Sequence, residues 1–176
     1  TFDPEILREY DIRGIVGKNL SATDAYYVGL AYATYVKRKT GGNRICLGYD
    51  GRHSSPDFQR AMVEGMMTAG ATVERVGLGP TPMLYFAVKD RKADAGLMIT
   101  GSHNPGNYNG FKMTLQNAPV FGEAVQEIGK IAAAGDYELG QGSIADFDIQ
   151  DAYVDRLMRD TKLVAGKSMK IAWDCG

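Results

Sequence analysis

The chemically promising residues of this chain gather in one short segment, Thr100-Gly101-Ser102-His103-Asn104-Pro105. The segment follows the apolar run at 95–99, and α/β folds place their chemistry where polar residues follow a buried strand. Ser102 is a nucleophile that needs a base, a lowered pKa or a metal before its hydroxyl attacks. Backbone N–H groups near Gly101 and the Asn104 side chain can stabilise the charge of a phosphate. We therefore predict that Ser102 carries a phosphoryl group.

Three basic side chains are candidates for handling phosphate charge or protons around Ser102. Arg13 precedes a glycine in an expected loop and can grip a phosphate with two hydrogen bonds. Lys112 lies across an expected hairpin and would act as a point charge or a proton carrier. His103 can shuttle protons or hold the loop in shape. The structural alternatives are a simple turn at Ser102, a surface ion pair at Arg13 and a solvated side chain at Lys112.

Alternating strand-like and helix-like patterns form the frame that must position this loop. Strands are predicted at 44–49, 72–76, 95–99, 109–115 and 169–173, and helices at 23–39, 55–70, 83–89, 122–134 and 151–161. Ser21 or Thr23 is expected to cap the first helix and Ser55 the second. The charged turn at 50–54 is interpreted as structural rather than as a ligand site. The alternation predicts an α/β fold, a layered domain with a mixed, mostly parallel sheet flanked by helices.

A change of composition divides the chain near its end. Residues 135–148 are rich in turn formers and show little apolar periodicity. We therefore place a domain boundary within residues 135–148. One helix and one strand cannot bury a core of their own, so we expect the chain to be the N-terminal piece of a longer protein.

Composition argues against several classes of protein. The 176 residues hold 20 Lys and Arg against 21 Asp and Glu, a net charge of −1, which gives no support for a nucleic acid or a membrane surface as partner. No apolar run is long enough to span a bilayer, and the first residues lack a signal-peptide pattern. Two distant cysteines, Cys46 and Cys175, make structural disulfides unexpected and favour a reducing cytoplasm. With only two histidines, they do not build a zinc site.

Three spaced motifs give the chain a family resemblance. They are residues 100–105, Tyr10-Asp11-Ile12-Arg13-Gly14 and Tyr108-Asn109-Gly110-Phe111-Lys112. Together they resemble the α-D-phosphohexomutase superfamily, and in particular its bacterial phosphomannomutase/phosphoglucomutase branch, whose serine loop has the form TGSHNP. Segments 48–52 and 79–82 fall where the family has similar sequences, so the resemblance covers essentially the whole chain.

The resemblance implies reversible phosphoryl transfer through Ser102 in a four-domain enzyme. Residues 1–146 would be its first domain, and residues 147–176 would begin the second. The phosphorylated serine donates its group to a hexose monophosphate, and the bisphosphorylated sugar reorients and returns its other phosphate. Hexose 1-phosphate and hexose 6-phosphate are thereby interconverted. The implied cofactors are Mg²⁺, held at Ser102 through its phosphate, and hexose 1,6-bisphosphate as activator and intermediate. The family's carboxylate-rich metal loop does not occur in this sequence.

Six residues match active-site positions of the family. The resemblance makes four of them catalytic and two of them substrate or phosphate contacts: Ser102, Arg13, Lys112 and His103, then Tyr10 and Asn104. Arg13 and Lys112 are expected to stabilise charge and handle protons, and His103 and Asn104 to position the loop. The implied partners are a phosphorylated hexose and the remaining domains of the same protein, with neither nucleic acid nor membrane.

Two other functions compete with this interpretation. One is a stand-alone module that binds phosphate or a partner without catalysis. A Ser-His hydrolase would need a G-x-S-x-G elbow, and Asn104 stands where its second glycine belongs. We expect the isolated chain to be inactive as a mutase, because the metal carboxylates and sugar contacts that the family uses are absent from it.

Overall fold

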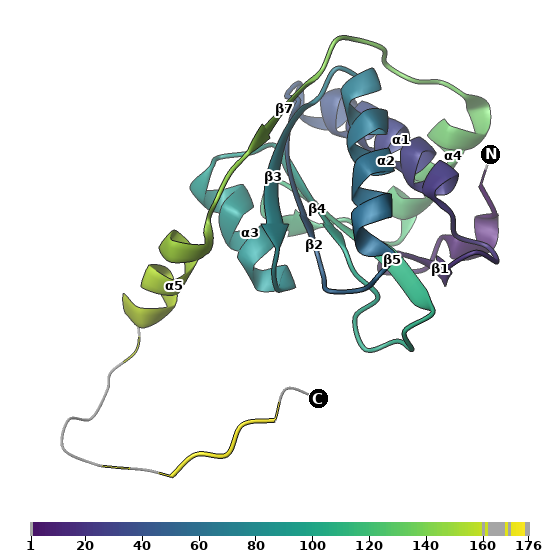
Figure 1. Cartoon of the computed structure of the whole chain (residues 1–176). Helices are drawn as coiled ribbons and strands as arrows, with labels where there is room; N and C mark the ends of the chain where they lie inside the picture. The colour runs from purple at the N-terminus through teal and green to yellow at the C-terminus, as the bar shows by residue number, and fades with distance from the viewer. Residues whose placement is uncertain (1, 160, 162–167, 169, 175–176) are drawn as a thin grey trace.

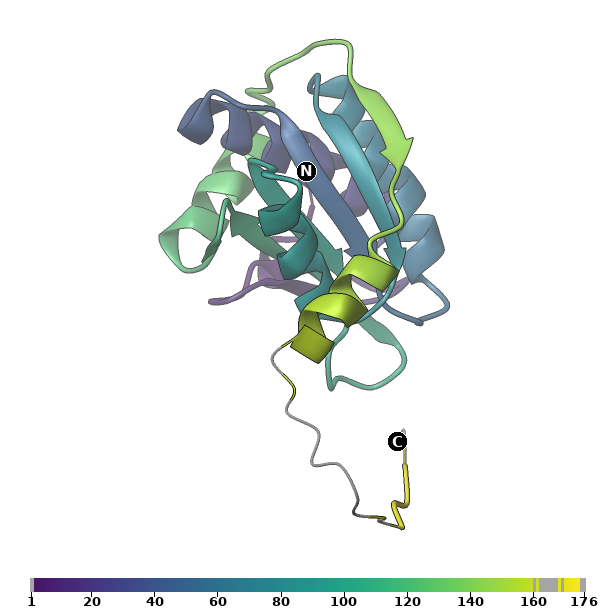
Figure 2. The same ribbon diagram turned by 90° about the vertical axis from the view of Figure 1, so that its left-hand side faces the viewer.

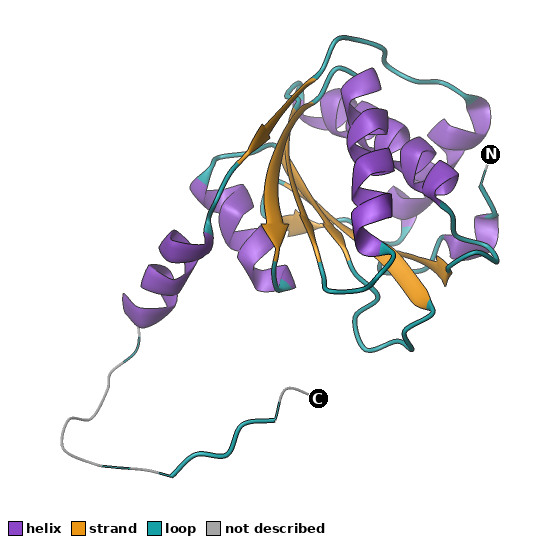
Figure 3. Cartoon of the chain, viewed as in Figure 1, coloured by secondary structure: helices purple, strands orange, loops and turns teal. Residues whose placement is uncertain are grey.

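The computed structural model describes residues 2–159, 161, 168 and 170–174 (Figure 1). After a short 3-10 helix at Pro4–Ile6, strands and helices alternate along the chain, except that three strands follow one another over residues 95–119 (Figure 3). The strands are β1 (Ile12–Ile15), β2 (Arg44–Tyr49), β3 (Thr72–Leu78), β4 (Ala95–Ile99), β5 (Tyr108–Leu115), β6 (Ala118–Pro119) and β7 (Ser143–Asp146). The helices are α1 (Ala22–Thr40), α2 (Ser55–Thr68), α3 (Thr81–Asp90), α4 (Glu123–Ala134) and α5 (Gln150–Arg159).

The strands form one mixed sheet in the order β1-β5-β4-β2-β3-β7, with β6 paired to β5. Strands β4, β2, β3 and β7 are parallel neighbours, while β5 pairs antiparallel with β4, β1 and β6. All strands except β5 therefore point the same way. This arrangement confirms the predicted α/β domain with a mixed, mostly parallel sheet.

Helices cover both faces of the sheet and give the domain three layers (Figures 1 and 2). Helices α1, α2 and α4 pack on one face, where their apolar residues join Ile45, Leu47, Leu97 and Phe111 in the larger core. Helix α3 packs on the other face, in a smaller core that includes Met98. A strand that is buried on both faces has a continuous apolar sequence. Strand β4 fits this rule, because it is buried at every position.

The connections reverse direction between β2 and β4. From β2 the chain crosses through α2 to β3 on one side, and it returns through α3 to β4 on the other side. In open α/β sheets, ligands bind beyond the carboxyl ends of the strands at such a reversal. The topology therefore points to the segments that follow Tyr49 and Ile99.

Two glycines allow α1 and α2 to approach each other closely. A Cβ built on Gly65 would lie 2.0 Å from the carbonyl oxygen of Tyr26, and one on Gly29 would lie 2.5 Å from that of Met62. Helix α1 begins with a capping box between Ser21 and Asp24. Of the two caps predicted for this helix, Ser21 is therefore the one confirmed.

The C-terminal part of the domain is attached by side chains of β3 and α3. Arg75 forms a two-bond ion pair with Asp146 at 2.7 and 2.9 Å, and the Arg91 guanidinium lies 3.8 Å from the centre of the Phe147 ring. Helix α5 then contacts α3 through Phe86 and Tyr153. Strand β7 thus extends the sheet within the predicted first domain.

Most predicted elements are confirmed, and a few details are wrong. Arg13 lies in strand β1 rather than in a loop, because β1 is a short strand stabilised by distant pairing with β5. Ser55 is inside helix α2 rather than its cap, and its hydroxyl instead donates to Asp50 at 2.7 Å. The strand expected at 169–173 does not form over residues 170–173, which are exposed and pair with no other strand. Met169 lies outside the described residues.

Two further observations concern composition. Cys46 is a buried free thiol whose pKa burial raises to about 12, whereas Cys175 lies outside the described residues. In the described part of the chain, none of the helices is long and apolar enough to cross a membrane.

We expect Gly65→Ala to destabilise the domain by about 1–3 kcal/mol, because the new methyl group would overpack against the α1 backbone. This cost exceeds the gain of up to about 1 kcal/mol in helix propensity. Urea unfolding of the 176-residue chain measures the change. Gly106→Ala is the matched control, since its Cβ meets open space. Equal stability of the two variants would contradict the close helix contact.

Candidate functional site

The predicted serine loop connects β4 to β5 at the reversal point of the sheet. Ser102 is exposed and has φ of 53°, in the left-handed region that non-glycine residues seldom adopt. Its N–H donates to the Thr100 hydroxyl at 2.9 Å. A conformation of this kind costs on the order of 1–3 kcal/mol and persists only where surrounding contacts hold it. The loop must therefore contain such contacts.

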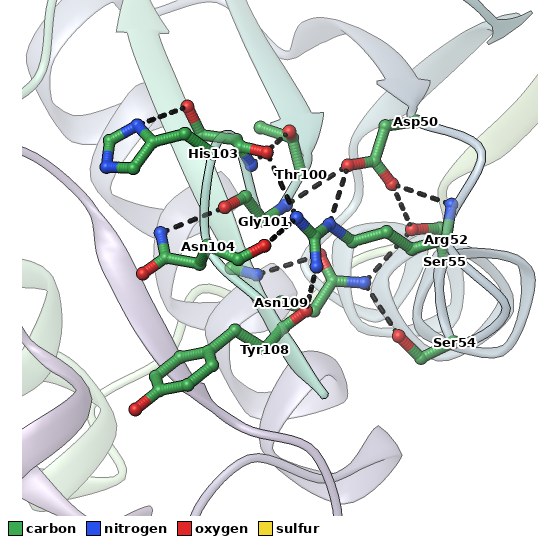
Figure 4. A network of polar contacts seen from close by, with 12 residues as sticks. Asp50, Arg52, Ser54, Ser55, Thr100, Gly101, His103, Asn104, Tyr108 and Asn109 are labelled. Carbon is green, nitrogen blue, oxygen red and sulfur yellow. Dashed lines mark hydrogen bonds and ion pairs between the residues drawn. The ribbon is translucent and has the colours of Figure 1, made fainter. Parts of the chain in front are cut away.

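Arg52 supplies most of them from the end of β2 (Figure 4). Its Nη2 donates to the carbonyl oxygens of Ser102 at 3.0 Å and Asn104 at 2.6 Å. Its Nη1 donates to those of Pro105 at 2.7 Å and Tyr108 at 2.9 Å. One side chain thus ties together both ends of the loop.

Asp50 orients Arg52 and the start of the loop at once. Its Oδ2 accepts hydrogen bonds from Arg52 Nε at 3.2 Å and from Gly101 N–H at 3.1 Å, while Oδ1 accepts from Ser55. Burial alone would raise the pKa of Asp50, but hydrogen bonds from Ser55, the Arg52 N–H, Thr100 and the Gly101 N–H outweigh it and lower the pKa. Asp50 is therefore held as a carboxylate.

Asn109 connects the same network to helix α2. Its side chain is fully buried, and its Nδ2 donates to the hydroxyls of Ser54 at 2.8 Å and Ser55 at 3.0 Å. Its Oδ1 accepts from the Gly110 N–H at 2.8 Å. The start of β5 is in this way anchored to the first turn of the helix that follows Asp50.

A second cluster lies on the neighbouring strands. Asp11 is buried, and one of its oxygens, Oδ2, pairs with both Arg13 Nη2 at 2.5 Å and Lys112 Nζ at 3.2 Å. Arg13 and Lys112 keep about a quarter of their side-chain surface exposed, at 24% and 28%. Two cations therefore share one carboxylate oxygen and remain open to solvent on one side.

The two clusters occupy the same end of the sheet. Thr100 N–H donates to the Gly110 carbonyl, and Gly110 is the register partner of Arg13, so three neighbouring strands bring these residues into one row. Lys112 is the register partner of Met98 and lies two residues from Gly110, so its side chain shares a face with that of Arg13. Met98 packs in the smaller core with residues of α3, so Arg13 and Lys112 lie on the face of the sheet that α3 covers.

The other predicted site residues take different positions. The Ser102 hydroxyl lies 3.5 Å from His103 Nδ1, and both side chains are exposed. Asn104 Nδ2 donates to the Gly101 carbonyl at 3.0 Å, so this amide also stabilises the loop. Tyr10 is 72% exposed and lines a shallow pocket together with Lys112.

Sequence reasoning missed the residues that hold the site in place: Asp11, Asp50, Arg52 and Asn109. The turn at 50–54, which we predict to be structural, makes contacts within the protein, but its sequence does not reveal that Arg52 reaches the carbonyl groups of a distant loop. The available signal was topological, because residues that follow adjacent parallel strands meet at one edge of the sheet. Asp11 belongs to the motif at residues 10–14, in which only Tyr10 and Arg13 are predicted as site residues.

The described residues do not form a complete magnesium site. Magnesium takes near-octahedral oxygen ligands, often with one or two carboxylates. Within residues 2–159, 161, 168 and 170–174, no group of three His, Cys, Asp or Glu side chains could hold a metal ion. Asp50 is already occupied by Arg52, Ser55 and Gly101. The Ser102 hydroxyl could offer one further oxygen.

The lowered pKa of Asp50 predicts acid sensitivity of the domain. An unfolded aspartate titrates near about 3.9, so the stabilisation from Asp50 is fully present above that pH and is lost as the pH falls through the lower folded pKa. Asp50→Asn should cost about 1–3 kcal/mol at pH 7, because each Asp50 oxygen accepts two hydrogen bonds and the amide nitrogen that replaces one of these oxygens can only donate.

Urea unfolding of both proteins between pH 7 and pH 2 measures this effect. The gap in unfolding free energy between the parent and Asp50→Asn should narrow below about pH 4. Asp57→Asn is the control, since Asp57 pairs on the surface with Arg60. A gap that stays constant over the whole range would contradict a charged Asp50 in the folded domain.

Comparisons with known proteins agree with this geometry. Residues 4–138 match the family described as phosphoglucomutase/phosphomannomutase, alpha/beta/alpha domain I. A phosphoglucomutase of Neisseria gonorrhoeae is 43% identical over 98% of this chain, and a phosphomannomutase/phosphoglucomutase of Pseudomonas aeruginosa is 36% identical over 100% of it. The chain spans 37% of the length of each of these relatives.

A solved structure shows the same fold. It is a phosphoglucomutase/phosphomannomutase family protein from Burkholderia thailandensis, which superposes with a TM-score of 0.89 at 38% identity. The match covers 93% of this chain and 37% of that one. The chain therefore belongs to the phosphoglucomutase/phosphomannomutase family and has the fold of its first α/β/α domain.

Proposed function

We propose that this chain is the phosphoserine-bearing part of a phosphohexomutase that interconverts hexose 1-phosphate and hexose 6-phosphate. The observation that carries the proposal is the exposed Ser102 on a loop fixed by Arg52, at the same end of the sheet as Arg13 and Lys112. Because the chain spans 37% of its relatives, the activity is proposed for the complete protein. Residues 1–146 would be its first domain, and 147–176 would begin its second.

The proposed reaction is transfer of a phosphoryl group between Ser102 and a sugar hydroxyl. In the first half, the bond from phosphorus to Ser102 Oγ breaks while a bond forms to the sugar oxygen. The sugar hydroxyl loses a proton, and Ser102 Oγ gains one. The reverse transfer uses the other phosphate of the bisphosphorylated sugar. Catalysis of this kind depends mostly on positioning and charge stabilisation.

Arg13 and Lys112 would stabilise the charge of the phosphate. Asp11 holds both cations through one oxygen, which orients them without covering their exposed surface. Arginine can bind phosphate with two parallel hydrogen bonds, while lysine acts as a mobile point charge suited to proton handling. His103 and Asn104 would complete the loop side of the site, and Tyr10 would contact the substrate from the pocket it shares with Lys112.

Mg²⁺ and a hexose 1,6-bisphosphate belong to this proposal as the family's cofactor and intermediate. Any magnesium at the Ser102 phosphate would take its carboxylate ligands from outside the described residues, since these do not form a complete site. The sugar phosphate and the remaining domains of the protein are the proposed partners, and the cytoplasm is the proposed location.

Replacement of the nucleophile tests the proposal directly. In the complete protein, Ser102→Ala should remove phosphate incorporation and lower turnover of hexose 1-phosphate by at least about 10³-fold, because no oxygen remains to accept the group. A coupled assay and mass spectrometry of the loop peptide measure both effects. Ser143→Ala is the control, since Ser143 is an exposed serine of β7. Normal turnover by Ser102→Ala would contradict the covalent mechanism.

The 176-residue chain alone should show no measurable mutase turnover with Mg²⁺. It spans only 37% of the length of relatives that are named as mutases. The same coupled assay, run beside the complete protein at equal concentration, provides the measurement. Turnover by the isolated chain would mean that the described site is sufficient. Phosphate binding without turnover by the complete protein would favour a binding module, and cleavage of an activated ester would favour a hydrolase.

A further inference from the structure

Arg52 uses every hydrogen-bond donor it has within the protein. A guanidinium carries five N–H donors in a fixed planar fork. One goes from Nε to Asp50 Oδ2, two go from Nη2 to the carbonyl oxygens of Ser102 and Asn104, and two go from Nη1 to those of Pro105 and Tyr108. A substrate phosphate could therefore bind Arg52 only if some of these hydrogen bonds were broken. Arg52 differs in this respect from Arg13, which remains partly exposed.

Gly101 provides the space in which the Arg52 fork lies. A Cβ built on Gly101 would lie 2.3 Å from both Cζ and Nε of Arg52, so any larger residue would displace the guanidinium. The backbone of Gly101 also donates to the same Asp50 oxygen that accepts from Arg52 Nε. Asp50, Arg52 and Gly101 therefore form one unit, in which each member sets the position of the other two.

The groups held by this unit belong to the backbone of the reactive loop. One of them is the carbonyl of Ser102 itself, the residue with φ of 53°. The other three carbonyls lie on the C-terminal side of Ser102, up to the first residue of β5. The backbone conformation of Ser102, and with it the direction of its Cα–Cβ bond, is thus set by contacts within the protein. Figure 4 shows the fork in the centre of the loop, with the carbonyl groups around it.

We propose that Arg52 is a positioning residue for phosphoryl transfer, which sets the place of Ser102 Oγ and does not itself touch the substrate. This inference rests on the proposed function. It gives Arg52 a signature that differs from that of a phosphate-binding arginine. A misplaced nucleophile lowers kcat, and a shift of about 1 Å can cost about 10²-fold. Substrate binding stays nearly unchanged when the lost side chain made no contact with substrate.

The first test compares Arg52→Lys with Arg60→Lys in the complete protein. A lysine keeps the charge but lacks the planar fork, so Arg52→Lys should lower kcat by about 10²-fold and change KM by less than about threefold. Arg60 is exposed on helix α2 and pairs only across the surface with Asp57, so Arg60→Lys should match the parent. A large rise in KM at unchanged kcat would show that Arg52 binds the substrate, and parent-like kinetics would show that it does not position Ser102.

A second pair of variants reaches the same unit from its other side. Gly101→Ala should displace the guanidinium and reproduce the loss of kcat, whereas Gly106→Ala, in the same loop but facing open space, should not. The double variant Gly101→Ala/Arg52→Lys should lose little more than either single variant, because both changes break the same contacts. Multiplied losses in the double variant would overturn the proposal.

Hydrogen exchange separates this inference from the proposed function. In Arg52→Lys the amides of Ser102 and Asn104, which donate to Thr100 and to Gly101 in the parent, should exchange at least about tenfold faster, while Arg60→Lys leaves them unchanged. This readout needs no turnover. A complete protein without mutase activity would refute the proposed function, but faster loop exchange would still establish that Arg52 holds Ser102. Unchanged loop exchange in Arg52→Lys would overturn the inference even in an active enzyme.

Discussion

An exposed serine in a left-handed backbone conformation is the constraint on which the rest of this structure depends. The unfavourable φ of Ser102 must be offset by contacts that a mobile surface loop does not have. Charge-assisted hydrogen bonds are roughly twice as strong as neutral ones, and Arg52 makes four of them to loop carbonyls. Asp50 keeps that guanidinium in place and stays ionised because hydrogen bonds outweigh its burial.

The sheet makes this arrangement possible. Strands β2 and β4 are parallel neighbours at the point where the connections reverse, so Arg52 and Ser102 meet although 50 positions separate them. Strand β5 then returns antiparallel beside β4 and brings Lys112 to the same end of the sheet, and β1 adds Arg13 on the next strand. Asp11 holds these two cations with one buried oxygen. The α/β frame thus brings Ser102, in the loop after β4, to the same end of the sheet as two cationic side chains on β5 and β1.

The fold and the reactive loop could be predicted from local sequence, because buried strands such as Ala95–Ile99 and helices such as Ala22–Thr40 have continuous or periodic apolar patterns. Strands β1 and β7 could not. Strand β1 is short and contains Gly14, every position of β7 is exposed, and both depend on pairing with distant partners. The residues that hold the site were missed for the same reason.

At the site, the position of the serine loop was predictable, while the contacts that support the loop were not. Ser102 stands in a recognisable motif after a buried strand. The contacts of Arg52 go to backbone carbonyls, which every sequence provides, so no pairing of residue types reveals them. The sequence of the 50–54 turn therefore does not reveal which distant groups Arg52 contacts.

The most direct measurement of the central claim follows a labelled phosphoryl group. The complete protein would be incubated with hexose 1,6-bisphosphate carrying labelled phosphorus, digested, and its labelled peptide sequenced. The account predicts label on Ser102 that is released when unlabelled hexose monophosphate is added. Label on another residue, or an unlabelled protein that still converts hexose 1-phosphate to hexose 6-phosphate, would contradict it.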